Sequence, residues 1–281
     1  MKKLACAKIN LGLNIVARRP DGYHDLETVF YPIPLFDELE VEEIVGGSSR
    51  EKTYELIIEG DEVDCPDDEN LVVKAYRMLA ADFTLPPVRI RLRKQIPSQA
   101  GLGGGSSDAT TTLLIINEMF GLKINKSLLQ SYASRLGADC PFFVEAEPVF
   151  ATGIGNIFTP LPSPIAELKG KTIIVVKPDI AVSTREAYAM LRPRKPEICC
   201  RKVVEMRLEE WKERLRNDFE EPVFSKHIEL RSIKETLYNA GALYAQMSGS
   251  GSAIFGIFDE EPKEMIILSA SSECKTFTMR L

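Results

Sequence analysis

Hydrophobic and polar residues alternate strictly in the segment just before a glycine-rich run. In residues 88–93, valine, isoleucine and leucine occupy every second position and arginines fill the others, which predicts a strand with one buried face. After the glycines, residues 109–119 are mainly apolar residues and helix formers. They predict a helix that ends before Gly121, because glycine often terminates helices. The glycine-rich run is therefore expected at a strand-to-helix turn.

Further apolar segments predict two pairs of strands nearer the N-terminus. Residues 5–16 and 26–33 flank the turn-forming residues 20–22, so they are predicted to form a hairpin. The extended segments 39–44 and 54–58 are predicted to form a second pair, joined by a polar segment. Antiparallel strands are thus expected throughout this part of the chain.

The remaining pattern predicts an α+β protein of two domains. Prolines at 160, 162 and 164 mark the best boundary, which gives an N-terminal domain of residues 1–160 and a C-terminal domain of residues 161–281. The other predicted elements are helices at 70–81 and 127–136, a strand at 171–176, a helix with the apolar stripe Leu230, Ile233 and Leu237 closed by Gly241, strands at 242–247 and 252–258, and a C-terminal helix and strand.

The glycine-rich run has the composition of an anion-binding turn. Glycine has no Cβ, so the backbone can approach a ligand closely, and the following helix directs free N–H groups and its positive end at an anion. Ser106, Ser107 and Asp108 are also candidates for capping that helix. A flexible linker or an elaborate helix cap is the alternative interpretation. The candidate phosphate-binding residues are Pro97, Ser98, Gln99, Ala100, Gly101, Leu102, Gly103, Gly104, Gly105, Ser106 and Ser107.

The run does not fit the two commonest nucleotide-binding motifs. A Walker A motif needs a lysine after its last glycine, where Ser106 stands. A dinucleotide fingerprint needs a third glycine three residues after Gly103, and Ser106 again occupies that position. Phosphate binding is therefore expected without membership of either group.

Composition and charge narrow the class of protein. The chain has 281 residues, of which 44% are hydrophobic and 27% charged, as is typical of globular proteins. A net charge of −6 argues against broad nucleic-acid binding. There is no run of about 18 apolar residues for a membrane span, and Lys8 and Asn10 interrupt any signal-peptide core, so a cytoplasmic protein is expected. Six cysteines without CxxC spacing and only two histidines predict no metal site built from them.

Four separated stretches of the chain resemble one family. Residues 7–11 (AKINL), 19–24 (RPDGYH), 101–108 (GLGGGSSD) and 137–141 (GADCP) together resemble the GHMP kinase superfamily, and residues 247–251 (MSGSG) match its C-terminal glycine loop. The resemblance implies an N-terminal mixed-sheet nucleotide-binding domain and a C-terminal ferredoxin-like α+β domain. Residues 19–24 point, within the family, to kinases that phosphorylate a hydroxyl of a cytidyl diphosphate alcohol in the non-mevalonate route to isoprenoid precursors.

The resemblance also implies roles for individual residues. The glycine-rich run would hold the phosphates of ATP, with Mg²⁺ bound mainly through the phosphate oxygens. Asp139 would accept the proton of the attacking hydroxyl, and Lys8 would keep Asp139 ionised and stabilise charge on the transferring group. Taken alone, Asp139 is a turn or capping residue and Lys8 a solvated surface charge. Whether Lys8 acts in the chemistry or only on Asp139 stays open.

A substrate pocket is implied at the mouth of the predicted hairpin. By resemblance, Tyr23 would stack on the cytosine and His24 would hydrogen-bond to it, because an aromatic face suits a pyrimidine and a neutral imidazole both donates and accepts. Asn10 would lie nearby, and Thr184 and Tyr188 are further candidates for substrate binding. Without the resemblance, Tyr23 and His24 are ordinary hairpin packing residues.

Several alternatives remain open at the level of sequence. Another kinase of the family, acting on mevalonate, phosphomevalonate or homoserine, is one alternative function, and a non-catalytic nucleotide-binding sensor is another. Lys94 stands next to the glycine-rich run and either contacts ATP or lies in water. The sequence does not define the oligomeric state.

Overall fold

The chain divides into two compact units, each assembled from separate stretches. The computed structural model describes residues 1–45, 53–61, 63, 65–161, 165–262 and 274–281. The first unit comprises Met1–Ala7, Leu35–Ser98 and Gly103–Ala146, and the second comprises Lys8–Pro34, Gln99–Leu102 and Glu147–Leu281. Strands β1 (Lys2–Arg18) and β2 (His24–Glu43) contribute to both. The functional division expected at residue 160 stays a prediction, since Pro162 and Pro164 lie outside the described residues.

In the sheet of the first unit, β4 lies between two other strands. β4 (Val88–Lys94) runs parallel to β3 (Tyr54–Gly60) and antiparallel to the second half of β2. Ile90 of β4 therefore lies between Val41 and Leu56 in the register. The prediction that residues 39–44 and 54–58 pair with each other was wrong, because β4 separates them. The polar segment 46–52 that joins them lies outside the described residues.

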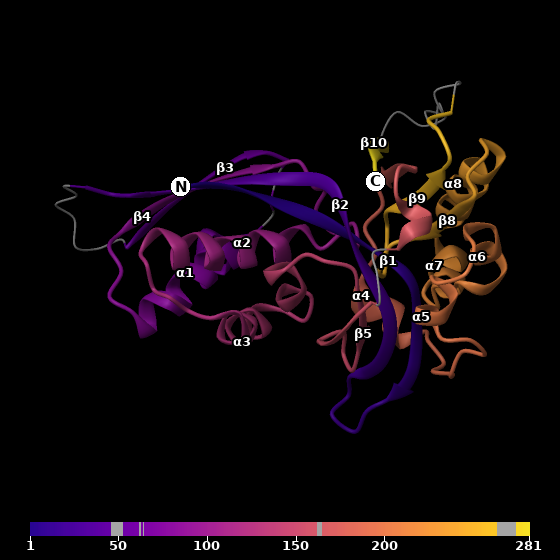
Figure 1. The fold of residues 1–281 in the computed structure, drawn as a ribbon, viewed down its shortest axis with the longest axis horizontal. Helices are drawn as coiled ribbons and strands as arrows, with labels where there is room; N and C mark the ends of the chain where they lie inside the picture. Colours follow the sequence, from indigo (N-terminus) through magenta and orange to yellow (C-terminus); the bar gives the residue numbers. More distant parts are fainter. Residues whose placement is uncertain (46–52, 62, 64, 162–164, 263–273) are drawn as a thin grey trace. The chain divides into compact units, whose positions relative to one another are not determined.

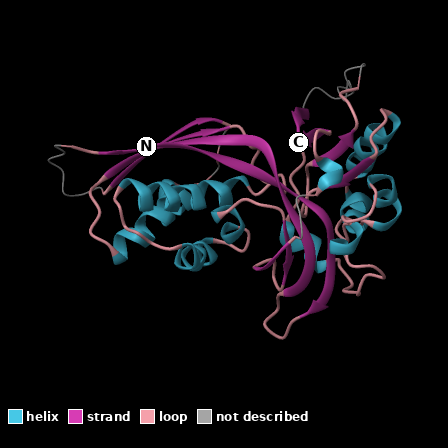
Figure 2. Ribbon diagram, in the orientation of Figure 1, coloured by secondary structure: helices cyan, strands magenta, loops and turns pink. Residues whose placement is uncertain are grey.

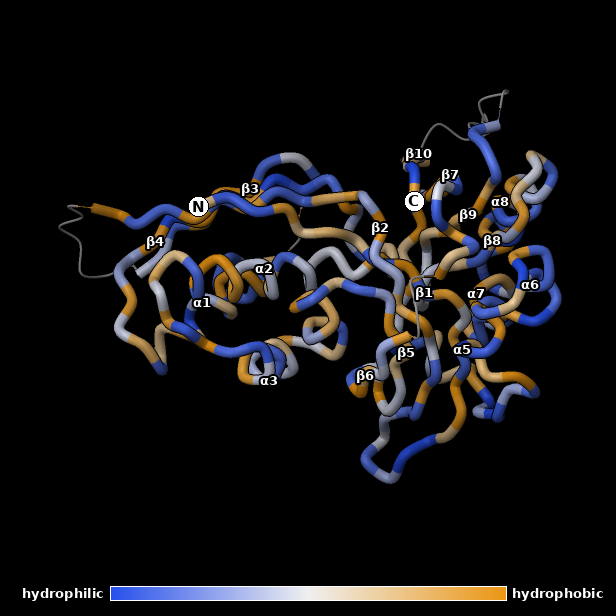
Figure 3. Tube along the Cα trace, viewed as in Figure 1, coloured by the Kyte–Doolittle hydropathy of each residue, from blue (hydrophilic) through white to orange (hydrophobic). Residues whose placement is uncertain are grey.

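Three helices cover one face of this sheet (Figure 1) and enclose the core of the first unit. They are α1 (Leu71–Asp82), α2 (Gly104–Met119) and α3 (Lys126–Leu136), and two short 3₁₀ segments, Asp67–Glu69 and Cys140–Val144, accompany them. Both α1 and α2 carry hydrophobic as well as hydrophilic residues (Figure 3). Asn70 and Asn125 cap α1 and α3 by accepting hydrogen bonds from Val72 N and Leu128 N. The predictions of α1 and α3 are confirmed to within one residue.

The second unit contains a strand ladder and a separate four-stranded sheet. The first half of β2 pairs with β5 (Val149–Thr152), which pairs with β6 (Ile157–Pro160). The four-stranded sheet is entirely antiparallel, with the order β10-β7-β9-β8. Its strands are β7 (Thr172–Pro178), β8 (Tyr244–Met247), β9 (Ile254–Phe258) and β10 (Cys274–Arg280).

Helices pack against this second sheet and complete its core. They are α4 (Thr184–Ala189), α5 (Cys200–Val203), α6 (Leu208–Arg214), α7 (Glu220–Lys226) and α8 (Ile228–Asn239), with a 3₁₀ turn at Ala166–Leu168. The predicted stripe of α8 is confirmed, because Leu230, Ile233 and Leu237 are all buried. The predicted C-terminal helix falls on residues 263–273, outside the described part.

The single tryptophan of the chain belongs to the second unit. Trp211 is buried on α6, where its ring meets Tyr244 edge-on at 5.6 Å and its Nε1 donates a hydrogen bond to Met206 O at 3.1 Å. Helices and strands are mixed in both units (Figure 2), which confirms the predicted α+β class. In the part of the chain that the structure describes, no helix combines the length and apolarity that crossing a bilayer requires.

Candidate active site

The first turn of α2 holds the part of the predicted anion-binding run that belongs to the first unit. Helix α2 begins at Gly104, five residues before the predicted start, and Gly103 precedes it with a left-handed backbone (φ +73°) and no side-chain cap. The expectation that Ser106, Ser107 and Asp108 cap the helix was wrong, because all three lie inside its first turns. The initial N–H groups of a helix have no intrahelical acceptor. They are therefore available to an anion, and the residues present fit a phosphate.

Gly104 and Gly105 both lie in this turn, but the lack of a side chain serves a different purpose at each position. A Cβ on Gly104 would lie 2.9 Å from Ile96 Cγ2, so this position needs glycine in order to pack against Ile96, two residues after the end of β4. Gly105 is exposed, and the nearest atom to a Cβ there would be Leu71 Cδ1 at 3.8 Å. Gly104 thus brings the helix close to the sheet, and Gly105 leaves its outer side open to a ligand.

Asp139 also belongs to the first unit, at the start of the 3₁₀ segment Cys140–Val144. Its side chain makes no capping hydrogen bond to that segment, so of the interpretation of Asp139 as a turn or capping residue only the capping part is wrong. The turn is held instead by α2, since Thr110 Oγ1 donates to Cys140 O at 2.8 Å. The half-buried carboxylate is consequently carried by a turn that does not depend on it as a cap.

Lys94 does not lie in water, which was one of the two environments expected for it. It is 4% exposed, and its Nζ pairs with Asp37 and with Asp108 Oδ2, the latter at 2.7 Å. Burial lowers the pKa of Lys94, but the charges of the two aspartates outweigh burial and leave its pKa raised. Burial raises the pKa of Asp108 to about 7, helped by Asp37 and opposed by Lys94. Sequence analysis did not predict this cluster, because Asp37 stands 57 residues from Lys94.

Substitution of Asp108 by Asn is expected to reduce the dependence of stability on pH. The folded state binds a proton at Asp108 with a pKa of about 7, above the ordinary 3.8. Stability from this group is therefore fully present below pH about 4 and declines as the pH rises through 7. Asn does not ionise, so the variant should not lose this stability. Between pH 5 and pH 8, the free energy of unfolding of the variant should therefore rise relative to that of the wild type by on the order of 2 to 3 kcal/mol.

Urea denaturation of both proteins at several pH values measures that difference. Parallel stability curves for wild type and Asp108→Asn from pH 5 to pH 8 would show that Asp108 does not titrate in this range.

In the second unit, Lys8 is buried and held by two oxygen acceptors. Its Nζ donates to Asn10 Oδ1 at 2.7 Å and to Gly101 O at 3.0 Å, and it lies 5.2 Å from the centre of the Phe30 ring. Asn10 in turn donates to Thr28 Oγ1 at 2.9 Å. The interpretation of Lys8 as a solvated surface charge is wrong, since it is only 4% exposed. The structure therefore joins two predicted site residues, Lys8 and Asn10, to the glycine-rich run at Gly101.

The first half of the glycine-rich run packs against a second loop of small residues, 248–251, called the second small-residue loop below. Ser248 Oγ donates to Gly101 O at 2.9 Å, and Ala253 N donates to Ala100 O at 3.1 Å. Gly101 has φ +76°, and a Cβ there would lie 2.0 Å from Ser248 O. Asn217, which sequence analysis missed, supports the second loop by donating to Met247 O and Gly249 O, both at 2.8 Å.

The hairpin between β1 and β2 presents the two residues predicted to read a base. Tyr23 is 62% exposed at the turn, and the ring of the half-buried His24 stacks on Tyr188 with centroids 5.1 Å apart. Tyr188 also meets Phe219 edge-on at 4.9 Å. Burial and the charge of Arg18 lower the pKa of His24. A neutral imidazole is thereby favoured, which both donates and accepts hydrogen bonds.

Thr184 lies at the first position of α4 and reaches the second small-residue loop. Its Oγ1 lies 2.9 Å from Ser250 Oγ, and the preceding Ser183 caps the helix by accepting from Glu186 N. Thr184 is exposed, so its hydroxyl is accessible to a ligand. Among the candidate site residues, those within the second unit thus form two groups, one around Lys8 and one around His24. The roles of Lys8 and Asp139 stay predictions.

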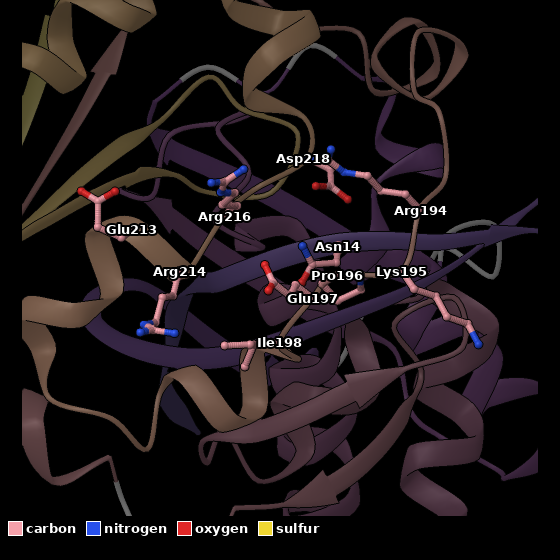
Figure 4. Close-up of a pocket in the computed structure, with 10 residues that line it drawn as sticks. All are labelled: Asn14, Arg194, Lys195, Pro196, Glu197, Ile198, Glu213, Arg214, Arg216 and Asp218. Carbon is pink, nitrogen blue, oxygen red and sulfur yellow. The ribbon is translucent and has the colours of Figure 1, made fainter.

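A cavity of about 510 Å³ in the second unit was not anticipated from the sequence (Figure 4). Asp218 lies in its wall and accepts a hydrogen bond from Ile15 N at 2.8 Å. Burial raises the pKa of Asp218, while the positive charges of Arg194 and Arg216 act in the opposite direction. In the described residues, no group of three or more histidine, cysteine, aspartate or glutamate side chains is arranged to hold a metal ion.

Comparison with known proteins relates the chain to kinases. Residues 70–147 match the family model of the GHMP kinases N terminal domain, and residues 201–276 match that of the GHMP kinases C terminal domain. The chain is 49% identical over 268 residues to the 4-diphosphocytidyl-2-C-methyl-D-erythritol kinase of Parabacteroides distasonis, covering 95% of both chains. It is 50% identical over 255 residues to the kinase of the same name from Bacteroides thetaiotaomicron, covering 91% of both.

Solved structures extend the comparison to three dimensions. A crystal structure of 4-(cytidine 5'-diphospho)-2C-methyl-D-erythritol kinase matches with a TM-score of 0.80 and 33% identity, covering 99% of this chain and 98% of that chain. The Methanococcus jannaschii mevalonate kinase matches with a TM-score of 0.73 at 15% identity, covering 100% and 98%. The second match is a likeness of fold alone.

Proposed function

The chain belongs to the GHMP kinase family, and on that premise we propose that it transfers the γ-phosphoryl group of ATP to the 2-hydroxyl of 4-diphosphocytidyl-2-C-methyl-D-erythritol. Membership of the family also confirms the predicted two-domain GHMP fold. The observation that carries the choice of substrate is 49% identity, over 95% of both chains, to a kinase that bears this substrate's name. The products would be the 2-phosphate and ADP.

ATP is proposed to bind along the glycine-rich run, residues 97–107. The support is local: the uncapped first turn of α2, the left-handed Gly103 and the open outer side of Gly105. The backbone N–H groups and the helix dipole would neutralise phosphate charge. Mg²⁺ would be held mainly through the phosphate oxygens and would offset charge that develops during transfer.

Asp139 and Lys8 are proposed as the catalytic pair. Asp139 would accept the proton of the 2-hydroxyl as that oxygen attacks the γ-phosphorus and the bond to the ADP oxygen breaks. Lys8 would favour the ionised form of Asp139 and stabilise charge on the transferring group. The hydrogen bonds of Lys8 to Asn10 and Gly101 O would orient its ammonium group.

The cytidyl group is proposed to bind at the hairpin mouth. Tyr23 offers an exposed aromatic face, and His24 offers an imidazole whose lowered pKa suits hydrogen bonding to a neutral base. Tyr188, already stacked on His24, would supply a second aromatic contact. Asn10 and Thr184 would contribute polar contacts to the rest of the substrate.

A panel of alcohols tests the choice of substrate. Purified protein with Mg-ATP should phosphorylate 4-diphosphocytidyl-2-C-methyl-D-erythritol and leave mevalonate, phosphomevalonate and homoserine unchanged, as measured by mass spectrometry and ADP release. Turnover of another alcohol in place of the cytidyl compound would replace the proposal by a sister activity. ATP binding without phosphorylation of any of these alcohols would indicate a nucleotide sensor.

The same assay with Tyr23→Ala locates the base. Stacking of a base on an aromatic side chain contributes about 1 to 3 kcal/mol, so KM for the cytidyl substrate should rise about 5- to 150-fold while KM for ATP stays within about twofold. Because Tyr23 is 62% exposed, its removal does not open the core. Equal losses for both substrates would place Tyr23 outside the cytosine site.

A further inference from the structure

Three charged side chains form a buried cluster in the first unit. Asp37 and Asp108 are 0% and 2% exposed, and both pair with the Nζ of Lys94. Two carboxylates thus share one ammonium group. Asp108 Oδ1 is buried and has no hydrogen-bond partner among the described residues. Buried ion pairs of this kind are weak evidence for stability, because desolvation offsets most of the attraction.

The cluster connects the segment that precedes the glycine-rich run with the helix residue that follows it. Lys94 is the last residue of β4, and Asp108 lies on α2, immediately after the run. Asp37 reaches from β2, and its Oδ1 accepts hydrogen bonds from Gln95 N at 2.5 Å and Ile96 N at 2.8 Å. The end of β4 and the beginning of α2 are therefore both tied to the same three side chains.

The cluster also determines what Gly104 packs against. A Cβ on Gly104 would lie 2.9 Å from Ile96 Cγ2 and 3.3 Å from Lys94 Nζ. The amide of Ile96 is held by Asp37, and Lys94 is held by both aspartates. A shift of Asp37 or Asp108 would consequently move the surface on which the first residue of α2 lies.

We propose that Asp37, Lys94 and Asp108 are positioning residues that fix the first turn of α2 for the phosphates of the nucleotide, without touching the nucleotide themselves. The inference rests on the proposed function only in that ATP is the ligand of this turn. Binding through backbone N–H groups depends on their placement, and a displacement of about 1 Å costs up to about 100-fold in a reaction that requires alignment.

The matched pair Asp108→Ala and Asp108→Asn tests the link to α2. Asp108→Ala removes the acceptor for Lys94 but leaves Lys94 paired with Asp37, so no buried charge is orphaned. We expect it to raise KM and Kd for ATP about tenfold, with KM for the alcohol within about twofold. Asp108→Asn keeps an acceptor of the same shape and should restore ATP binding to within about threefold of wild type.

A second pair, Asp37→Ala and Asp37→Asn, tests the link to β4. Asn retains one oxygen for the amides of Gln95 and Ile96, whereas Ala retains none. The same pattern is expected, with an ATP-specific defect in the alanine variant and substantial rescue by asparagine. All measurements are made well below each variant's melting temperature, so that a fall in stability alone does not change KM.

Two results would overturn the inference. If Asp108→Ala and Asp37→Ala lower the melting temperature but leave Kd for ATP unchanged, the cluster is only structural. If KM rises equally for ATP and for the alcohol, the cluster does not act on the phosphate-binding turn. ATP affinity is measured by calorimetry without the second substrate, so this test remains decisive even if the cytidyl alcohol is not turned over and the proposed function fails.

Discussion

Replacing Asp139 by Asn is expected to slow phosphoryl transfer by about 10²- to 10⁴-fold, the range that general base catalysis contributes. Asn has the same shape as Asp but does not accept the proton of the attacking hydroxyl. The turn should survive the change, because the side chain of Asp139 does not cap Cys140–Val144 and Thr110 holds that segment through Cys140 O. The affinity for ATP should therefore change by less than about threefold.

Single-turnover kinetics with saturating ATP and calorimetric ATP titration separate these two quantities. Asp82→Asn is a suitable control, since Asp82 also lies in the first unit and accepts a hydrogen bond from Tyr132 away from the proposed chemistry. A transfer rate in Asp139→Asn equal to that of the control would remove Asp139 from the role of base.

Gly101→Ala is expected to have the largest effect on folding. The left-handed backbone at φ +76° alone costs an alanine about 1 kcal/mol. A Cβ there would also lie 2.0 Å from Ser248 O and 3.3 Å from Gly251 O. These are backbone atoms, so they do not yield as the tip of a flexible side chain would. We expect a total loss of about 3 kcal/mol or more in the free energy of unfolding.

Activity should fall with stability in this variant. Gly101 O accepts hydrogen bonds from both Lys8 Nζ and Ser248 Oγ, so displacing it disturbs the orientation of Lys8. Gly121→Ala is the matched control, because Gly121 has φ +59° and, among the described residues, no atom lies within 4 Å of the added Cβ. Chemical denaturation of both variants isolates the steric contribution. Equal losses of stability in the two would show that contact with the second loop does not constrain Gly101.

Local periodicity predicted most elements but not their partners. The alternation in residues 88–93 identified β4 correctly, because a buried face imposes a period of two on any strand. The same pattern contains no information about neighbours, so β3 was assigned to β2 although β4 lies between them. Helix α2 begins at Gly104 despite the low helix propensity of glycine, since close packing on Ile96 overrides propensity there.

In the candidate site too, features formed by neighbouring residues were predicted, and contacts between residues distant in sequence were not. The hairpin turn and the glycine-rich run are each formed by consecutive residues, and both were predicted. The environment of Lys94 depends on Asp37, and the support of the second loop depends on Asn217, neither of which lies near its partner in sequence. The one local signal available was the position of Asp37, an acidic residue that takes the alternate place between Leu35 and Leu39 on the buried face of β2.

The position of the only tryptophan gives the second unit an optical signal of its own. Intrinsic tryptophan emission comes entirely from Trp211, which is buried in the second unit, whereas far-ultraviolet circular dichroism follows the helices of both units. In an unfolding titration, coincident midpoints for the two signals would mean that the interleaved units melt in one cooperative transition. Separate midpoints would identify which unit opens first, without any label being introduced.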